Sequence, residues 1–381
     1  MHPDRILVGS AQTLSGLRAA SRLKNVYASW VPPAKIVTIN TFSSEMAKLV
    51  ANAMLAQRIS SINAVSAICD ELGLGADVDD VSLALGKDRR LGPHFLQAGV
   101  GFGGSCFEKD ILNLSYLANQ LHLDVVADYW LGVLRINEHQ RQRFARKIVH
   151  ELNGSLRGKK IAVLGFAFKD GTNDTRNSIA VHVIRDIAEE VPREIAIFDP
   201  GCSSVDIMEE IQRMGLGQGQ LGRVNIASSW RDAVRGATAV CVLTPWKQFR
   251  GRRLGNTVNK ELNGSLNARL PFGSGKSQRV LSEMDIMALE AFVGQAHGTM
   301  ASEDPLGRLR PLPACAARVC TGCKERGTEV CEAYDMVDWA EVAGMMQEPR
   351  WVFDGRNIVD LLELQGLGFR VRGIGKGAWM T

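Results

Sequence analysis

The sequence of 381 residues lacks an apolar run near the ~20 residues that a membrane-spanning helix needs. Its opening stretch, MHPDRILVG, holds no apolar segment of signal-peptide type. A dominant charge is also lacking, since 45 basic residues stand against 41 acidic ones and leave a net charge of +4. That balance argues against a nucleic-acid-binding or polybasic membrane protein. We therefore expect a cytoplasmic globular protein with neither a nucleic-acid nor a membrane partner.

The sequence also lacks a convincing dinucleotide-binding turn, which joins a strand to a helix through GxGxxG. The literal match at Gly217–Gly222 follows a predicted helix and precedes a predicted strand, so we interpret it as a chance match. Residues 1–40 predict only a strand at Ile6–Gly9, a helix to about Trp30 and a strand at Lys35–Thr38. Two strands and one helix are the tail of an α/β domain.

What is present divides the chain into four parts. Helical periodicity covers 41–152, and we expect one helix of about 30 residues to begin at Ser43 or Ser44 and to connect domains or form a subunit interface. Residues 153–249 and 333–381 alternate strands with helices, which predicts a doubly wound parallel sheet. Residues 250–332 have poor periodicity, and we expect a mobile, dispensable insertion.

Four of the eight cysteines cluster in this predicted insertion, at Cys315, Cys320, Cys323 and Cys331. Structural zinc sites favour two close pairs of ligands. Here the spacing Cys323-x7-Cys331 is too long for the second pair, so we predict no metal site. The stretch is interpreted as a lineage-specific loop or as translated non-coding sequence.

A glycine-rich segment ending in a cysteine, VGFGGSCFEKD at 100–110, is the strongest local motif. Its glycines allow the backbone to approach a ligand closely. A helix is expected to follow, with Ser105 as its cap. Cys106 would then lie at a helix N-terminus near Lys109, and both features favour a reactive thiolate. The alternative is a small buried cysteine in a tight turn.

Lys48 and Asn52 are four residues apart on the long predicted helix and therefore share one face. Their apolar neighbours, Leu49 and Val50 among them, predict a mostly buried setting in which the lysine needs an anionic partner. A developing alkoxide would serve as that partner. The alternative is a solvated polar stripe.

GFGGSCFEKD resembles the active-site signature of the UDP-glucose/GDP-mannose dehydrogenase family, and SSEMAKLVANAMLAQRISSIN resembles its central helix. The resemblance implies an α/β fold with a remnant of an N-terminal Rossmann domain (1–40), a central helical dimerisation region (41–152) and a C-terminal Rossmann-like UDP-binding domain (153–249 and 333–381). It implies NAD-dependent oxidation of UDP-glucose to UDP-glucuronate in two steps, through a thiohemiacetal and a thioester on the cysteine.

The same resemblance assigns roles to particular residues. It implies the catalytic group Cys106, Lys48, Asn52 and Asp110. It implies substrate contacts from Arg90 (reaching a neighbouring subunit), Phe95, Gln97, Ala98, Gly99, Val100, Gly101, Phe102, Gly103, Phe168, Lys169 and Arg356. It places Cys106, Lys109 and Arg176 beside the NAD, and it implies a homo-oligomer, a dimer or larger.

The sequence departs from the family at its N-terminal side. The family begins with an NAD-binding strand and helix well upstream of the match to Met1, and a glutamate that acts with the catalytic water falls just upstream as well. We therefore expect this chain alone to form no NADH. The alternatives are a non-catalytic UDP-sugar-binding or oligomerising member, a fragment of an intact enzyme, and a GDP-mannose or UDP-N-acetylmannosamine dehydrogenase.

Overall fold

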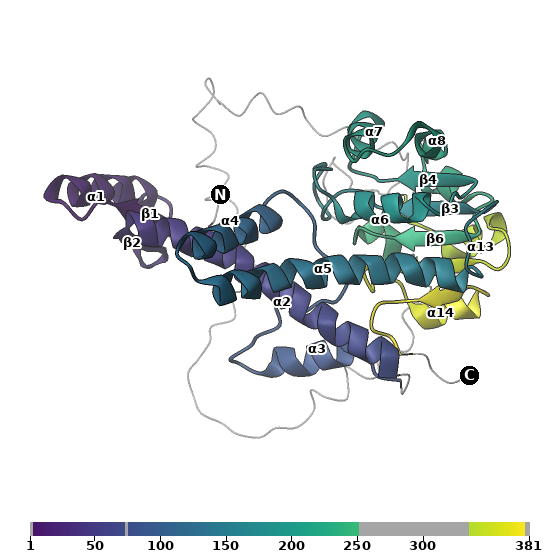
Figure 1. Ribbon diagram of the computed structural model, residues 1–381, viewed down its shortest axis with the longest axis horizontal. Coiled ribbons are helices and arrows are strands. Elements are labelled where there is room, and N and C mark those ends of the chain that lie inside the picture. The colour runs from purple at the N-terminus through teal and green to yellow at the C-terminus, as the bar shows by residue number, and fades with distance from the viewer. Residues whose placement is uncertain (1–2, 73–74, 251–334, 378–381) are drawn as a thin grey trace, which may run out of the picture. The chain divides into compact units, whose positions relative to one another are not determined.

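The computed structural model describes residues 3–72, 75–250 and 335–377, and all of them except Asp335 belong to one compact unit (Figure 1). The predicted insertion, apart from Arg250, lies outside the described residues. Its four clustered cysteines lie outside them too. Within the described ranges, no helix is long and apolar enough to cross a membrane.

The N-terminal part is the strand–helix–strand unit that the sequence predicts. Strands β1 (Ile6–Ser10) and β2 (Ile36–Asn40) pair in parallel, and α1 (Leu14–Ala28) connects them. A small core of Val8, Ala20, Val31 and Ile36 holds the unit together. Thr13 caps α1 by accepting the N–H of Gly16.

Helix α2 (Thr41–Leu72) has 32 residues, which confirms the long helix predicted from the sequence. The predicted start at Ser43 or Ser44 is wrong, because β2 runs directly into the helix. The side chain of Asn40 accepts the N–H of Ser43 at 2.8 Å, which is the capping role expected of a serine three or four residues later.

Three helices complete the helical region: α3 (Val78–Lys87), α4 (Phe107–Gln120) and α5 (Asp124–Glu151). Helices α2, α4 and α5 share a small core that includes Ala53, Ile111 and Val133. The N-cap residue of α4 is Cys106, and no side chain caps the helix, so the predicted cap at Ser105 is wrong. The hydroxyl of Ser105 instead faces the thiol of Cys106 at 4.0 Å.

The second sheet has six parallel strands in the order β5-β4-β3-β6-β7-β8. This is the doubly wound arrangement, with the order reversing between β3 and β6. The strands are β3 (Lys160–Leu164), β4 (Glu194–Phe198), β5 (Val224–Ile226), β6 (Ala239–Val242), β7 (Trp351–Asp354) and β8 (Arg370–Arg372). The predicted α/β fold class is confirmed.

Alternate strand residues face opposite layers of helices, as the two-residue period of a strand requires. Ile161 and Val163 belong to the core under α5, α6 (Ile179–Ala188) and α7 (Ser204–Arg213). Ala162 and Leu164 belong to the core under α9 (Trp230–Val234), α13 (Trp339–Met345) and α14 (Leu361–Gly366). The remaining helix, α8 (Gln218–Leu221), confirms that the GxGxxG match at 217–222 is not a strand-to-helix turn.

A buried carboxylate, Asp199 at the end of β4, organises the carboxyl edge of the sheet. It is 7% exposed, and it accepts hydrogen bonds from five donors. The donors are the main-chain N–H groups of Phe166, Ala167, Gly201 and Cys202 and the indole N–H of Trp246. These donors come from the segments after β3, β4 and β6, so one side chain fixes the edge where nucleotide ligands bind in such sheets.

We predict that Asp199→Ala lowers the free energy of unfolding by about 3 kcal/mol or more, because buried donors would lose their acceptor. Urea denaturation of the purified chain measures the change. The matched control is Asp124→Ala, since Asp124 is exposed in the first turn of α5, and it should cost about 0.5 kcal/mol. Equal losses in the two variants would contradict the organising role of Asp199.

Candidate active site

Cys106 is an exposed thiol at the N-terminus of α4. The interpretation as a small buried cysteine is therefore wrong. The main-chain N–H groups of the first turn of α4 point toward this end of the helix, and a helix N-terminus stabilises a negative charge such as that of a thiolate.

Three of the predicted catalytic residues come together one turn after Cys106. The N–H of Asp110 bonds the carbonyl of Cys106 at 3.0 Å. One carboxylate oxygen of Asp110, Oδ2, accepts the ammonium of Lys48 and the amide of Asn52, the latter at 2.6 Å. The other oxygen, Oδ1, is buried without a hydrogen-bond partner and lies 4.0 Å from Nζ of Lys109. Lys48 and Asn52, which share one face of α2, thus both bond the same carboxylate.

The expectation that Lys48 is mostly buried is wrong. Its side chain is 55% exposed, whereas that of Asp110 is 1% exposed. The anionic partner that the sequence demanded is supplied by the protein itself. The Lys48 side chain therefore lies partly at the protein surface. Its ammonium bonds the buried carboxylate of Asp110 and remains accessible to solvent.

The glycine segment before Cys106 is packed tightly by other parts of the chain. A Cβ atom at Gly103 would lie 2.5 Å from the carbonyl oxygen of Asn177, and one at Gly104 would lie 2.9 Å from the ring of Phe168. Gly101 (φ +123°) and Gly104 (φ +88°) also adopt backbone angles that suit glycine alone. At Gly103 and Gly104, the close approach predicted for a ligand is thus made by other residues of the same chain.

Polar side chains in the helices hold this segment from the other side, and the sequence reasoning missed them. Asn63 accepts the N–H of Gly99 at 2.9 Å, and Gln140 donates to the carbonyl of Gly99 at 2.7 Å. Asn137 bonds both the N–H and the carbonyl of Phe102. Asn137 and Gln140 share the face of α5 that carries the buried Val133 and Phe144, and amides at core-facing positions are the signal that could have revealed them.

Arg356 joins the same segment to the sheet. Its Nε donates to the carbonyl of Leu243 at 2.6 Å, and its Nη1 donates to the carbonyl of Gly101 at 3.0 Å. Burial lowers the pKa of Arg356 to about 10, so the guanidinium keeps its charge at neutral pH. The N–H of Val100 adds a bond to the carbonyl of Gly355 at 2.7 Å. The predicted substrate segment 97–103 and Arg356 are thus brought together.

The other predicted site residues are less closely linked. Phe168 packs on Gly104, and the ammonium of Lys169 lies 5.2 Å from the centre of the Phe168 ring. Arg176 is exposed and bonds Asp174 through Nε and Nη2. Phe95 has a left-handed backbone (φ 62°) and a half-exposed ring. Arg90 is 88% exposed and pairs with Asp88, so the described chain does not bring it to the thiol.

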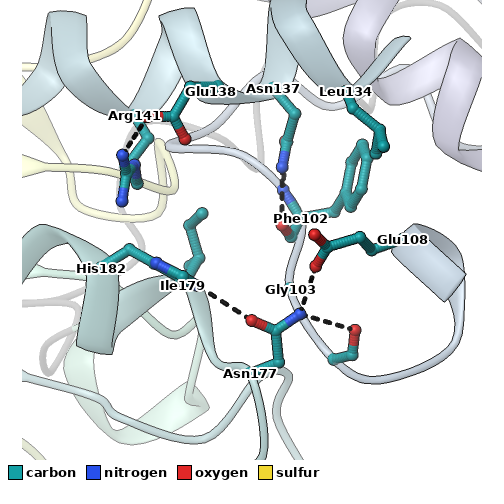
Figure 2. Close-up of a pocket in the computed structure, with 11 residues that line it drawn as sticks. Phe102, Gly103, Glu108, Leu134, Asn137, Glu138, Arg141, Asn177, Ile179 and His182 are labelled. Atoms are coloured by element: carbon teal, nitrogen blue, oxygen red, sulfur yellow. Dashed lines mark hydrogen bonds and ion pairs between the residues drawn. The ribbon is translucent and has the colours of Figure 1, made fainter. Parts of the chain in front are cut away.

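A pocket lies beside the glycine segment, between the start of α4, α5 and α6, and Figure 2 shows its lining. The polar side chains in its wall are Glu108, Asn137, Glu138, Arg141, Asn177 and His182. Of the predicted site residues, Phe102 and Gly103 line it, whereas Cys106 does not. Burial, together with the charges of Arg141 and Arg185, lowers the pKa of His182 to about 4, so its ring is neutral at neutral pH.

Two family models match this chain. The first, described as the central domain of the UDP-glucose/GDP-mannose dehydrogenase family, matches residues 42–139. The second, described as the UDP binding domain of the same family, matches residues 162–264. Together they match more than half of the chain.

Curated relatives and solved structures agree with these matches. A UDP-glucose 6-dehydrogenase of Caenorhabditis elegans is 48% identical over 65% of this chain and 51% of its own length. UDP-glucose 6-dehydrogenase 1 of Oryza sativa subsp. japonica is 35% identical over 99% of this chain and 63% of its own length. A UDP-glucose dehydrogenase structure from Pyrobaculum islandicum is 33% identical, with a TM-score of 0.55 over 66% of this chain and 54% of that one. The chain thus spans roughly half to two thirds of the length of these relatives.

We predict that iodoacetamide at neutral pH labels Cys106 at least about tenfold faster than Cys69, Cys202 or Cys241. Burial raises the pKa of each of the other three thiols, and Cys106 alone of these four is exposed. Mass spectrometry of the digested native protein measures the labelling rate at each of these four described cysteines separately. Faster labelling of any of the other three would show that the thiol is not presented as described.

Proposed function

Because this chain belongs to the UDP-glucose/GDP-mannose dehydrogenase family, we propose that it carries the sugar-nucleotide site and the thiol nucleophile of a UDP-glucose 6-dehydrogenase. The observation that carries the proposal is the convergence of Lys48 and Asn52 on Asp110, one helical turn from the exposed thiol of Cys106. A nucleophile and fixed charges at this spacing suit an acyl-type intermediate formed at a carbonyl carbon.

In the proposed reaction the C6 alcohol of the sugar is first oxidised to an aldehyde, and the thiolate of Cys106 then attacks the aldehyde carbon and forms a C–S bond. The carbonyl π electrons move to the oxygen, which becomes an oxyanion. Lys48 is exposed at the rim and can donate to that oxyanion, and Asn52 can donate beside it. Asp110 holds both donors in place from its buried position, and its carboxylate is proposed to help handle the water that hydrolyses a later thioester.

The sugar nucleotide is proposed to lie along segment 97–103 at the carboxyl edge of the sheet. The crevice between β3 and β6 is where doubly wound sheets bind nucleotides. Lys169 follows β3 at this edge and is proposed to meet the diphosphate, while the ring of Phe168 packs on Gly104. Arg356 uses Nε and Nη1 on main-chain carbonyls, so its Nη2 is the nitrogen proposed to reach the ligand.

NAD would supply the hydride acceptor for two oxidations, that of the C6 alcohol to the aldehyde and that of the thiohemiacetal to the thioester, but the described residues do not fit the whole dinucleotide. The turn from β1 to α1 has no GxGxxG pattern, and a Cβ at Gly9 would collide with Ser44. Arg176, the predicted NAD contact, is engaged with Asp174. We therefore propose that oxidation requires an NAD-binding domain in addition to these residues, and that the chain by itself binds UDP-glucose without forming NADH.

We predict that UDP-glucose binds this chain and slows alkylation of Cys106 at least about fivefold, because a sugar beside the thiol excludes the reagent. GDP-mannose and UDP-N-acetylmannosamine should protect less.

Lys169→Ala should weaken UDP-glucose binding about tenfold, measured by titration calorimetry, as expected for losing one charge-assisted contact to the diphosphate. The matched control is Lys35→Ala, which removes an exposed lysine near β2.

The outcomes separate the alternatives. Binding without protection of Cys106 would favour a non-catalytic UDP-sugar-binding member. Stronger protection by GDP-mannose or UDP-N-acetylmannosamine would move the substrate to that sugar. Failure of all three sugar nucleotides to bind would refute the proposal. NADH formed on adding NAD would refute the need for a further NAD-binding domain.

The proposal includes a homo-oligomer, a dimer or larger. Large apolar side chains are exposed on and between α4 and α5, among them Tyr116 (66%), Leu121 (60%) and Val125 (84%). Exposed large apolar side chains on two helices that pack against each other favour a subunit interface.

We predict that the chain sediments as a dimer or larger species, and that Val125→Glu shifts it toward the monomer because an interface core disfavours a charge. Analytical ultracentrifugation measures the distribution. Val205→Glu, at an exposed valine (62%) on α7, is the matched control and should leave it unchanged. A wild-type monomer at all accessible concentrations would contradict this part of the proposal.

A further inference from the structure

Asn177 has no role in the proposed reaction, yet it makes hydrogen bonds to four other residues near the thiol. It lies between Arg176 and the helix α6, and its backbone is left-handed (φ 49°), a conformation that asparagine tolerates better than most residues. Its main-chain carbonyl accepts the N–H of Gly104 at 2.7 Å. The residue therefore touches the backbone two positions before Cys106.

The side chain of Asn177 extends the contact to the first turn of α4. Its Nδ2 donates to the carboxylate of Glu108 at 2.7 Å and lies 3.5 Å from the carbonyl of Gly104. Figure 2 shows the amide between Glu108 on one side and α6 on the other. Because Glu108 is two residues after Cys106, Asn177 holds the chain on both sides of the thiol.

The orientation of this amide is fixed by its neighbours. A carboxylate is an acceptor only, so Nδ2 must face Glu108 and Oδ1 must face the opposite side. There Oδ1 meets Nε2 of His182 at 2.9 Å. The imidazole is neutral at neutral pH and has one N–H, which this contact places on Nε2. On the α7 side, the N–H of Asn177 donates to Glu210, whose residue is 4% exposed.

We propose that Asn177 is a positioning residue, which fixes the backbone of Gly103 and Gly104 and the first turn of α4 so that Cys106 faces the sugar nucleotide. This inference rests on the proposed function for what the thiol faces. The contacts of Asn177 with Gly104 and Glu108 are called the clamp. It connects the loop after β3, which is proposed to bind the diphosphate through Lys169, to the segment that carries Cys106. The bond between Asn177 and Glu108 is the contact that couples the two.

The pairing gives a test by exchange of polarity. Asn177→Asp keeps the size and the tolerance for the left-handed backbone, but it places a second carboxylate against Glu108. Repulsion should open the clamp, so exchange of the Gly104 N–H should become at least about tenfold faster. Alkylation of Cys106 should become at least about fivefold slower, because the added negative charge and the displaced helix start disfavour the thiolate.

The second substitution restores the contact. In Asn177→Asp with Glu108→Gln, the glutamine amide can donate to the aspartate, so both quantities should return to within about twofold of wild type. A role in general stability alone would give no such rescue. Asn153→Asp is the matched control, because Asn153 is also left-handed (φ 62°) but exposed at the end of α5, and it should change neither quantity.

Hydrogen-exchange mass spectrometry and the rate of alkylation are measured without ligand, so they test the clamp even if UDP-glucose fails to bind. Unchanged values in Asn177→Asp, or no recovery in the double variant, would overturn the inference and leave the proposed function standing. Should Asn177→Asp not fold, Asn177→Gly keeps the backbone angle and removes the side-chain bonds. Unchanged exchange at Gly104 in that variant would equally overturn it.

Discussion

The site depends on how closely the main chain at residues 101–104 approaches its neighbours. Gly103 lies against the carbonyl of Asn177, and Gly104 lies against the ring of Phe168, at separations that leave no room for a side chain. This contact brings the start of α4 to the loop that follows β3. The thiol at the N-terminus of α4 and the carboxyl edge of the sheet are neighbours for that reason, although 53 or more residues separate Cys106 from strand β3 in the sequence.

Buried carboxylates stabilise the loops that this close approach requires. Asp199 collects donors after three strands, and Asp354 accepts the N–H groups of Arg356, Ile358 and Val359 after β7. Burial raises the pKa of Asp354, and its main-chain donors act against that shift. Asp110 does the same for side chains, since it gathers Lys48 and Asn52. In each case a carboxylate, which can accept several hydrogen bonds, pairs with donors that have no partner in the hydrogen-bond ladder of a helix or strand.

The regular elements could be predicted because their signals are local. The apolar run at Lys160–Leu164 and the unbroken helical period after Thr41 need no distant partner to be recognised. The cap at Asn40 was missed because strand and helix are contiguous, so the helix begins before the first serine. The exposure of Lys48 was misjudged because its partner, Asp110, lies 62 residues away. Asn177 was missed for the same reason, since its bond to Glu108 spans 69 residues.

Helix α5 contributes to two hydrophobic cores at once. Its first half packs with α2 and α4 through Val133, and its second half packs on the sheet through Phe144 and Ile148. The first family match ends at residue 139 and the second begins at 162, so the interval between the two matches includes the half of α5 that covers the sheet. A sheet domain begun at residue 162 would lose α5 from the layer of helices that covers one face of the sheet. The helical region and the sheet domain are therefore not independent modules, and a recombination of either one with another protein must keep α5 whole.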